Sequence, residues 1–217
     1  MISHRAQAAF QRGQDWEERG DSAKAINAYR EAVAIEPDWA VPHQCLGKLY
    51  LETGRYDEAA AALRQARPIP LPGDGSIDDM LYVVDLIQKG ALDPTAYRYF
   101  VMARDLPDEQ LDEKVALCQR ALGLNPVYAA PYAVLGKALL AKGQLNQART
   151  VLERGLACTP PPFTRAALLF YLGNVLLVSG QRDQALDAFR RVVQLNANLS
   201  VTRFATTQLE AAAAGRI

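Results

Sequence analysis

The chain has 217 residues, of which 50% are hydrophobic and 22% are charged, a composition that excludes an intrinsically disordered protein. Lysine plus arginine and aspartate plus glutamate number 24 each, so the net charge selects no class of partner. No stretch reaches the roughly 18–20 apolar residues of a membrane span, and the first residues lack the apolar core of a signal peptide. We therefore expect a cytoplasmic protein without a membrane span, with three reduced, buried cysteines: Cys45, Cys118 and Cys158.

Four pairs of glycines recur along the chain, and the two members of each pair are seven residues apart. The pairs are Gly13/Gly20, Gly47/Gly54, Gly136/Gly143 and Gly173/Gly180. Around them apolar residues recur every three or four positions, and prolines punctuate the periodic stretches, which predicts helices and no sheet. The pattern indicates antiparallel helix pairs, because the first glycine permits close helix contact and the second ends the first helix.

Each glycine pair is followed by a small position and a large one. Twelve residues after the first glycine stands an alanine: Ala25, Ala59, Ala148 or Ala185. Sixteen residues after it stands a large apolar residue: Tyr29, Leu63, Leu152 or Phe189. We expect the alanine to admit a close helix crossing and the large residue to fill the space between one hairpin and the next.

This spacing resembles the tetratricopeptide repeat family. The resemblance is carried by Leu46-Gly47, Tyr50, Gly54, Tyr56 and Ala59, by Leu135-Gly136, Gly143, Leu145, Ala148 and Pro160, and by Leu172-Gly173, Gly180, Ala185 and Phe189. It covers roughly residues 6–73 and 95–199. The resemblance implies an all-α fold, a right-handed α-solenoid of stacked antiparallel helix pairs, with about twelve helices in all.

One repeat departs from the pattern. Residues 109–122 match a second helix, but Met102 stands where the glycine of the first helix is expected, and Lys114 replaces the alanine. We expect this hairpin, over 95–128, to pack less closely than the two at 6–73 and the two at 129–199.

Two stretches fit no hairpin. Within 74–94, Ser76 and Asp79 form a capping box, and an apolar stripe predicts an inserted helix over 77–89. The stripe consists of Ile77, Met80, Leu81, Val84 and Ile87. This helix either extends the stack or occupies part of a groove. Within 200–217, Ser200 is expected to cap a final helix at about 201–214 that closes the array.

No catalytic, cofactor or metal motif is present, so we expect a protein that is not an enzyme and needs no cofactor. His43 has no acid or nucleophile at motif spacing and is expected to be a semi-exposed groove or surface residue. Residues 74–85 faintly match a calcium loop but carry Asp79 and Asp85 at its glycine and glutamate positions. An acidic helix N-terminus accounts for this stretch better.

The family resemblance implies a concave groove, lined by first helices, that binds a protein or peptide partner. The candidate groove residues are Phe10, Gln14, Gln44, Lys48, Tyr99, Ala103, Lys137, Phe170 and Asn174. The paired lysine and asparagine with which some members grip a carboxylate are incomplete, since Gln44, Ala133 and Phe170 stand one turn before Lys48, Lys137 and Asn174. The aromatics favour an apolar or amphipathic segment, although Tyr99 and Phe170 fit equally well between adjacent first helices.

Charge is divided along the chain. Residues 1–113 hold 12 basic and 20 acidic side chains, and residues 114–217 hold 12 basic and 4 acidic ones. Drift in surface composition, head-to-tail self-association and a basic surface for an acidic partner all remain open. Nucleic acid or another polyanion is disfavoured, because the arginines of this half fall mostly on second helices without interleaved aromatics. The leading hypothesis is therefore an adaptor, scaffold or assembly factor.

Overall fold

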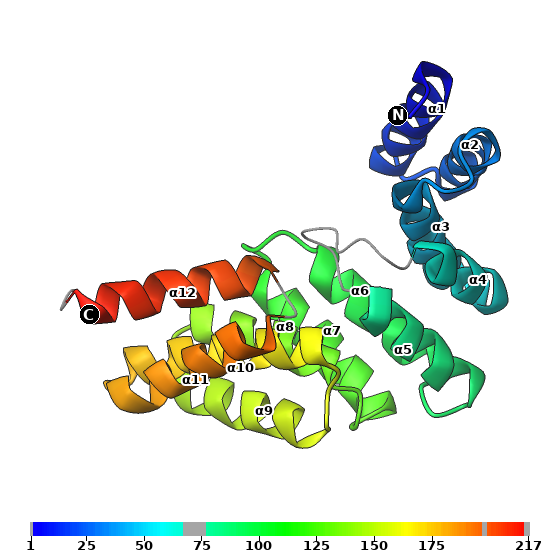
Figure 1. Ribbon diagram of the computed structural model, residues 1–217. Coiled ribbons are helices and arrows are strands. Elements are labelled where there is room, and N and C mark those ends of the chain that lie inside the picture. Colours follow the sequence, from blue (N-terminus) through cyan, green and yellow to red (C-terminus); the bar gives the residue numbers. More distant parts are fainter. Residues whose placement is uncertain (1, 67–76, 197–198, 215–217) are drawn as a thin grey trace. The chain divides into compact units, whose positions relative to one another are not determined.

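The structure, a computed structural model, describes residues 2–66, 77–196 and 199–214. Within these ranges it contains twelve α-helices and no strand, so the predicted all-α fold of paired helices is confirmed (Figure 1). The described residues form two compact units, 2–66 with 80–89, and 77–79 with 90–214. None of the described helices combines the length and the hydropathy that crossing a lipid bilayer requires.

The first unit contains two antiparallel helix pairs. The helices are α1 (His4–Glu18), α2 (Ser22–Ile35), α3 (Ala40–Glu52) and α4 (Tyr56–Ala66). α1 packs against α2, α2 against α3, and α3 against α4. Ser3 and Asp21 cap the starts of α1 and α2, where their side chains accept hydrogen bonds from backbone N–H groups of the first turn.

The second unit contains three helix pairs and one further helix. The helices are α6 (Pro94–Asp105), α7 (Leu111–Leu124), α8 (Ala130–Ala141), α9 (Leu145–Ala157), α10 (Pro162–Val178), α11 (Arg182–Leu195) and α12 (Leu199–Ala213). Consecutive helices pack together, and α10 also contacts α8 and α12 (Figure 1). Each unit is thus a stack of helix hairpins.

The glycine pairs act at the predicted places. Gly20, Gly54, Gly143 and Gly180 have φ between 72° and 78°, so the left-handed conformation ends each first helix. A Cβ built on Gly13, Gly47, Gly136 or Gly173 would lie 2.3–2.6 Å from the large side chain sixteen residues later. That side chain therefore packs on the glycine of its own hairpin. Leu152 also shares a core cluster with Leu168 and Val175 of the next hairpin, in agreement with the prediction that this position fills the space between hairpins.

Close packing between two hairpins is visible at Gly155, nineteen positions after Gly136. At Gly155 a Cβ would lie 2.7 Å from the side chains of both Tyr132 and Leu168. Gly155 thus lets α9 approach the first helix of its own pair and that of the next pair.

The α6–α7 hairpin corrects the predicted register. Met102, expected at the glycine position, is 53% exposed, whereas Ala103 is fully buried in one core cluster with Cys118. Ala103 and Cys118 lie 15 residues apart, one fewer than the sixteen between the glycine and the large residue of the other hairpins, and the turn between α6 and α7 spans 106–110. Ala103 is therefore the small residue at this crossing. The hairpin therefore does not lack a small residue, although Lys114 replaces the alanine of its second helix.

Two further helices flank these hairpins. The inserted helix α5 (Ile77–Gln88) is present as predicted, while its expected cap, Ser76, lies outside the described residues. Its buried residues are Met80, Val83, Val84 and Ile87. α12 begins at Leu199, so Ser200 lies within the helix and the prediction that it caps α12 is wrong.

The first turn of α5 is tied to the start of α10. Oδ2 of Asp79 accepts hydrogen bonds from the backbone N–H of Thr164 at 3.2 Å and from its hydroxyl at 2.5 Å. Burial raises the pKa of the Asp79 carboxyl to about 6, against the lowering effect of these hydrogen bonds. Asp79 therefore caps a helix that lies 85 residues further along the chain.

Candidate functional site

In the first unit, the predicted groove residue Phe10 belongs to an aromatic cluster. Its ring centroid lies 4.9 Å from that of Trp39 and 5.4 Å from that of Tyr29. Phe10 and Gln14 are half-buried, whereas Gln44 is buried. The aromatic plane of Phe10 is therefore only partly available to a partner.

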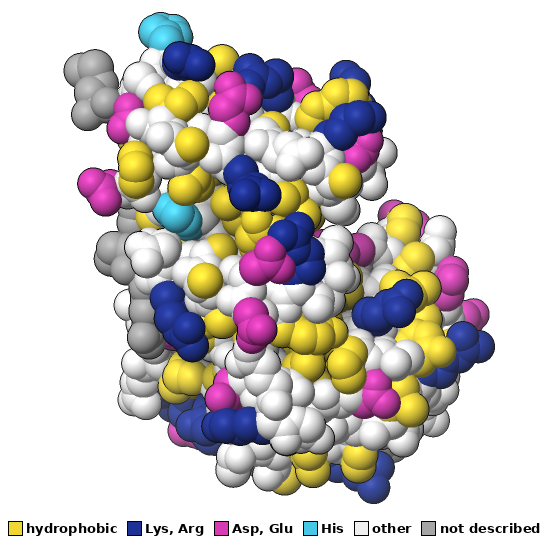
Figure 2. Space-filling model, turned by 90° about the vertical axis from the view of Figure 1, so that its right-hand side faces the viewer, with side chains coloured by type: hydrophobic (Ala, Val, Ile, Leu, Met, Phe, Trp, Pro, Cys, Tyr) yellow, Lys and Arg dark blue, Asp and Glu magenta, His cyan; other side chains and the backbone are white. Residues whose placement is uncertain are grey.

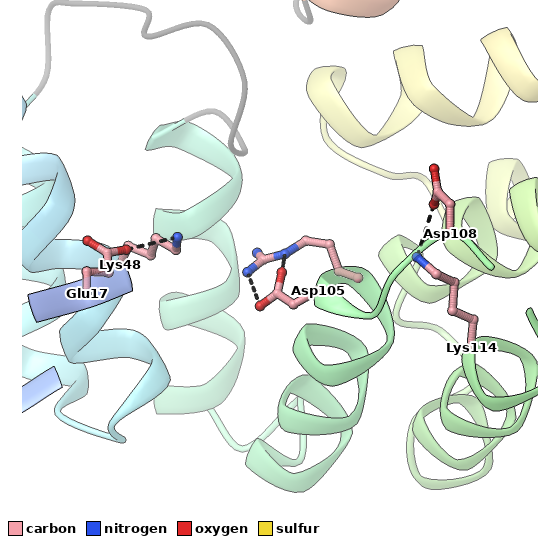
Figure 3. Close-up of polar contacts among 6 residues, drawn as sticks. Glu17, Lys48, Asp105, Asp108 and Lys114 are labelled. Carbon is pink, nitrogen blue, oxygen red and sulfur yellow. Dashed lines mark hydrogen bonds and ion pairs between the residues drawn. The ribbon is translucent and has the colours of Figure 1, made fainter. Parts of the chain in front are cut away.

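Lys48 pairs with a carboxylate of its own unit. Its Nζ lies 3.3 Å from Oε1 of Glu17 (Figure 3). The other carboxylate oxygen of Glu17 accepts a hydrogen bond from the Tyr29 hydroxyl at 2.8 Å. Burial, with Cys45 and Glu17 nearby, raises the pKa of the Tyr29 phenol far above its usual range. Lys48 thus belongs to a polar network that also holds a core tyrosine in place.

His43 is buried, so the prediction of a semi-exposed residue is wrong. Its Nε2 donates a hydrogen bond to the carbonyl oxygen of Pro37 at 2.8 Å. The imidazole fixes the turn between α2 and α3.

On α6, the one-residue register shift changes which side chains face outward. Ala103 is buried in the core and is not a groove residue, which corrects the prediction; Tyr99 is half-buried, 5.9 Å from the Arg120 guanidinium. Phe100, which the sequence did not single out, contacts Tyr128 edge to face, with 5.5 Å between the ring centroids.

In the second unit, Asp108 binds two lysines. Both of its carboxylate oxygens lie 2.9 Å from Nζ of Lys137, and Oδ1 lies 3.3 Å from Nζ of Lys114 (Figure 3 shows the Lys114 pair). These two ammonium groups, Lys137 first, hold the pKa of the Asp108 carboxyl below its ordinary value. Asp112 pairs with Lys142 in the same way, so all three lysines beyond residue 89 pair with the acidic stretch 108–112.

Phe170 of α10 lies at the centre of an aromatic cluster. Its ring centroid is 5.5 Å from that of Tyr171, 6.0 Å from that of Phe189 and 6.2 Å from that of Phe204 on α12. Phe204 is 61% exposed, while Phe189 is buried beneath the cluster. Phe170 therefore both packs between α10 and α12 and contributes to the surface.

Tyr171 packs beside α8, the helix that carries Lys137. Its side chain lies against a core cluster that includes Leu135 and Leu139 of that helix, and burial raises the pKa of its phenol. Asn174, one helical turn beyond Phe170, is half-buried. We call these residues the aromatic–lysine surface: Lys137, Phe170, Tyr171, Asn174 and Phe204.

The sequence carried an unused signal for Phe204. It follows Phe170 by 34 residues, the length of one repeat, so α12 occupies the place of a first helix in a further hairpin. α12 is thus more than a cap, because it also continues the row of first helices.

The basic side chains of the second helices are scattered. Arg149 pairs with Glu153 at 2.8 Å, and Arg182 donates a hydrogen bond to the carbonyl oxygen of Ala212. On the face drawn in Figure 2, basic and acidic side chains are interspersed among hydrophobic ones. That face presents no broad surface of a single sign.

Several solved structures resemble this chain, with TM-scores below 0.5. The MamA protein is 21% identical, covers 88% of this chain and 91% of its own, and has a TM-score of 0.43. A protein of Thermus thermophilus, TTC0263, is 18% identical; the match covers 94% of this chain and 98% of TTC0263, with a TM-score of 0.42. The TPR2AB domain of yeast Sti1 is 13% identical; the match covers 96% of this chain and 98% of that domain, with a TM-score of 0.49. No curated protein matches the sequence.

Family models match most of the helix pairs. One tetratricopeptide repeat model matches residues 18–69 and 108–169, and a second matches residues 166–199. Apart from Gly13, all the paired glycines that shape the hairpins lie within these ranges. The chain belongs to the tetratricopeptide repeat family.

Proposed function

We propose that this protein is a non-catalytic interaction module, an adaptor, scaffold or assembly factor, that binds a segment of a partner protein on the aromatic–lysine surface. The observation that carries the proposal is Phe204, a large apolar side chain that is 61% exposed and stacked on Phe170. Exposed aromatics beside polar groups are typical of protein-binding hot spots.

The neighbouring groups define the chemistry of the partner segment. Phe170, Tyr171 and Phe204 offer ring faces to an apolar side chain, and Asn174 offers an amide to a backbone group. Lys137, whose side chain is 45% exposed, offers a positive charge from α8, which packs against α10. An amphipathic helix or an extended segment can supply the apolar side chain, the backbone group and the negative charge that match these three features.

The first unit offers a smaller surface of the same kind. Phe10, Gln14 and Lys48 are half-buried on first helices, and Gln44 is mostly enclosed. We propose that this unit contributes secondary contacts, as does Tyr99 in the second unit.

Peptide selection tests the proposal before any natural partner is identified. A display library of random twelve-residue peptides is selected on the full chain, and the bound peptides are titrated against wild-type, Phe204→Ala and Phe170→Ala proteins. Each substitution is expected to weaken binding about 30-fold, because a hot-spot aromatic contributes about 2 kcal/mol. Phe10→Ala, in the first unit, is the matched control and should have a smaller effect.

Two results would refute the proposal: selection that yields no binding peptide, or peptides whose affinity does not change in Phe204→Ala and Phe170→Ala.

A further inference from the structure

In both units a lysine of a first helix pairs with a carboxylate of the preceding hairpin. Lys48 and Lys137 each directly follow a glycine at a helix crossing, and they bind Glu17 and Asp108 respectively. The two pairs differ in exposure. The side chains of Lys48 and Glu17 are 26% and 29% exposed, whereas those of Lys137 and Asp108 are 45% and 66% exposed. Only the second pair is open to a competing group.

Asp108 is not held in place by a helix or, among the described residues, by partners other than its two lysines. It lies in the turn between α6 and α7, outside both helices, and its contacts with Lys114 and Lys137 are all made by its side chain. The pair with Lys137 is exposed on both sides, and exposed ion pairs contribute little to stability. Glu17, in contrast, lies within α1 and also binds the Tyr29 hydroxyl.

Lys114 requires an anion at this place. Its side chain is only 6% exposed, and an uncompensated buried ammonium group is costly. If Asp108 moves away, another carboxylate must take its position. The pair of lysines therefore favours exchange of one carboxylate for another over simple opening.

We propose that Lys114 and Lys137 form a carboxylate-exchange site, in which an aspartate or glutamate of the partner segment replaces Asp108. This inference rests on the proposed function. Lys137 lies on α8, which packs against α10, the helix that carries Phe170 and Tyr171, so an apolar side chain next to the incoming carboxylate reaches the rings. The expected recognition element is thus an acidic residue close to an aromatic or aliphatic one, and Asp108 is a built-in competitor for it.

The test uses the same random twelve-residue display library on the full chain. Selection on wild type and Asp108→Asn should enrich peptides with an aspartate or glutamate near an apolar residue. These peptides should bind Asp108→Asn about 3–10-fold more tightly than wild type, since removal of an exposed ion pair of about 1 kcal/mol removes the competition. Lys137→Met should lose the preference for each peptide over its amide counterpart, in which Asn or Gln replaces the acid.

Glu17→Gln is the matched control, because it neutralises the equivalent, less exposed carboxylate and should not tighten binding. A second readout is the pKa of Asp108, followed by carboxyl-carbon NMR. Saturation with an acidic peptide should raise this pKa toward its ordinary value, because Asp108 loses its lysines.

The outcomes separate the two proposals. If Phe204→Ala weakens binding but Asp108→Asn and Lys137→Met leave the acid preference unchanged, carboxylate exchange is wrong and the binding surface stands. An Asp108 pKa that stays low in the peptide complex also overturns the exchange. If Phe204→Ala has no effect, the surface itself is wrong and the exchange falls with it. Selected acidic peptides whose affinity falls steeply with salt in proportion to their total charge would indicate non-specific polyanion binding instead.

Discussion

In each of four hairpins, the two helices pack closely because a glycine of the first helix lies against one large side chain of the second. Tyr29, Leu63, Leu152 and Phe189 are all fully buried against these glycines. The alanines twelve residues after the glycines are likewise fully buried, so the second helix also presents no bulk at the crossing. Because such crossings leave no void, added volume must shift the helices.

Ala148→Leu is therefore expected to destabilise the protein by about 1–3 kcal/mol, because a larger side chain in a filled crossing forces strain. Denaturant unfolding of the two proteins, followed by circular dichroism, measures the change. Ala116→Leu, at an exposed position of α7, is the control and should leave the midpoint nearly unchanged. An unchanged midpoint in Ala148→Leu would mean that the inferred close contact is absent.

Asp79 makes a pH-dependent contribution to stability. Its folded pKa of about 6 lies above the ordinary value of 3.8, so the folded state binds the proton more tightly than the unfolded state. The contribution is fully present below about pH 4 and is lost as the pH rises to about 6. Asp78 is the neighbouring charge that adds to the shift.

Asp79→Asn, which keeps an acceptor for Thr164 but cannot ionise, should remove this dependence. Unfolding free energies of both proteins at pH 4–8 provide the measurement. We expect Asp79→Asn to gain stability relative to wild type as the pH rises through 4–6, with a constant difference above. A difference that does not vary with pH would contradict the burial of an ionisable Asp79.

At the scale of elements, the sequence predicted the helices better than their registers. Glycine spacing located the four regular hairpins because the left-handed turn and the close crossing each demand glycine. The α6–α7 hairpin has neither glycine, so counting from its second helix placed Met102 where Ala103 lies. A turn of different length, here 106–110, leaves no mark in the apolar periodicity of the two helices that it joins.

The helix α12 shields the end of the second unit. Val201 and Ala205 are buried against a cluster that includes Phe189 and Val192 of α11. Removal of residues 199–217 is expected to lower stability by at least about 2–3 kcal/mol, through the loss of this apolar burial. Thermal unfolding measures the effect, with removal of residues 215–217 as the control. Equal midpoints in the two truncated proteins would show that α12 does not contribute to the core.

For the molecule as a whole, the family and the fold could be predicted from the sequence, but the candidate site could be predicted only in part. Lys137, Phe170 and Asn174 were located by their positions on first helices. Asp108 and Tyr171 were not, because an ion pair between hairpins and a ring contact within α10 both depend on side-chain geometry that repeat spacing does not encode. Head-to-tail association, predicted from the charge division, remains to be tested by sedimentation at low and high salt.

The central claim is that a partner segment binds the aromatic–lysine surface rather than the arginines of second helices. Calorimetric titration of a selected peptide against two double variants, Lys137→Ala with Asn174→Ala and Arg190→Ala with Arg191→Ala, tests it most directly. The account predicts at least about tenfold weaker binding for the lysine–asparagine pair, an unchanged affinity for the arginine pair, and a shallow salt dependence. Loss of binding only in the arginine pair, with a steep salt dependence, would contradict the account and favour polyanion binding.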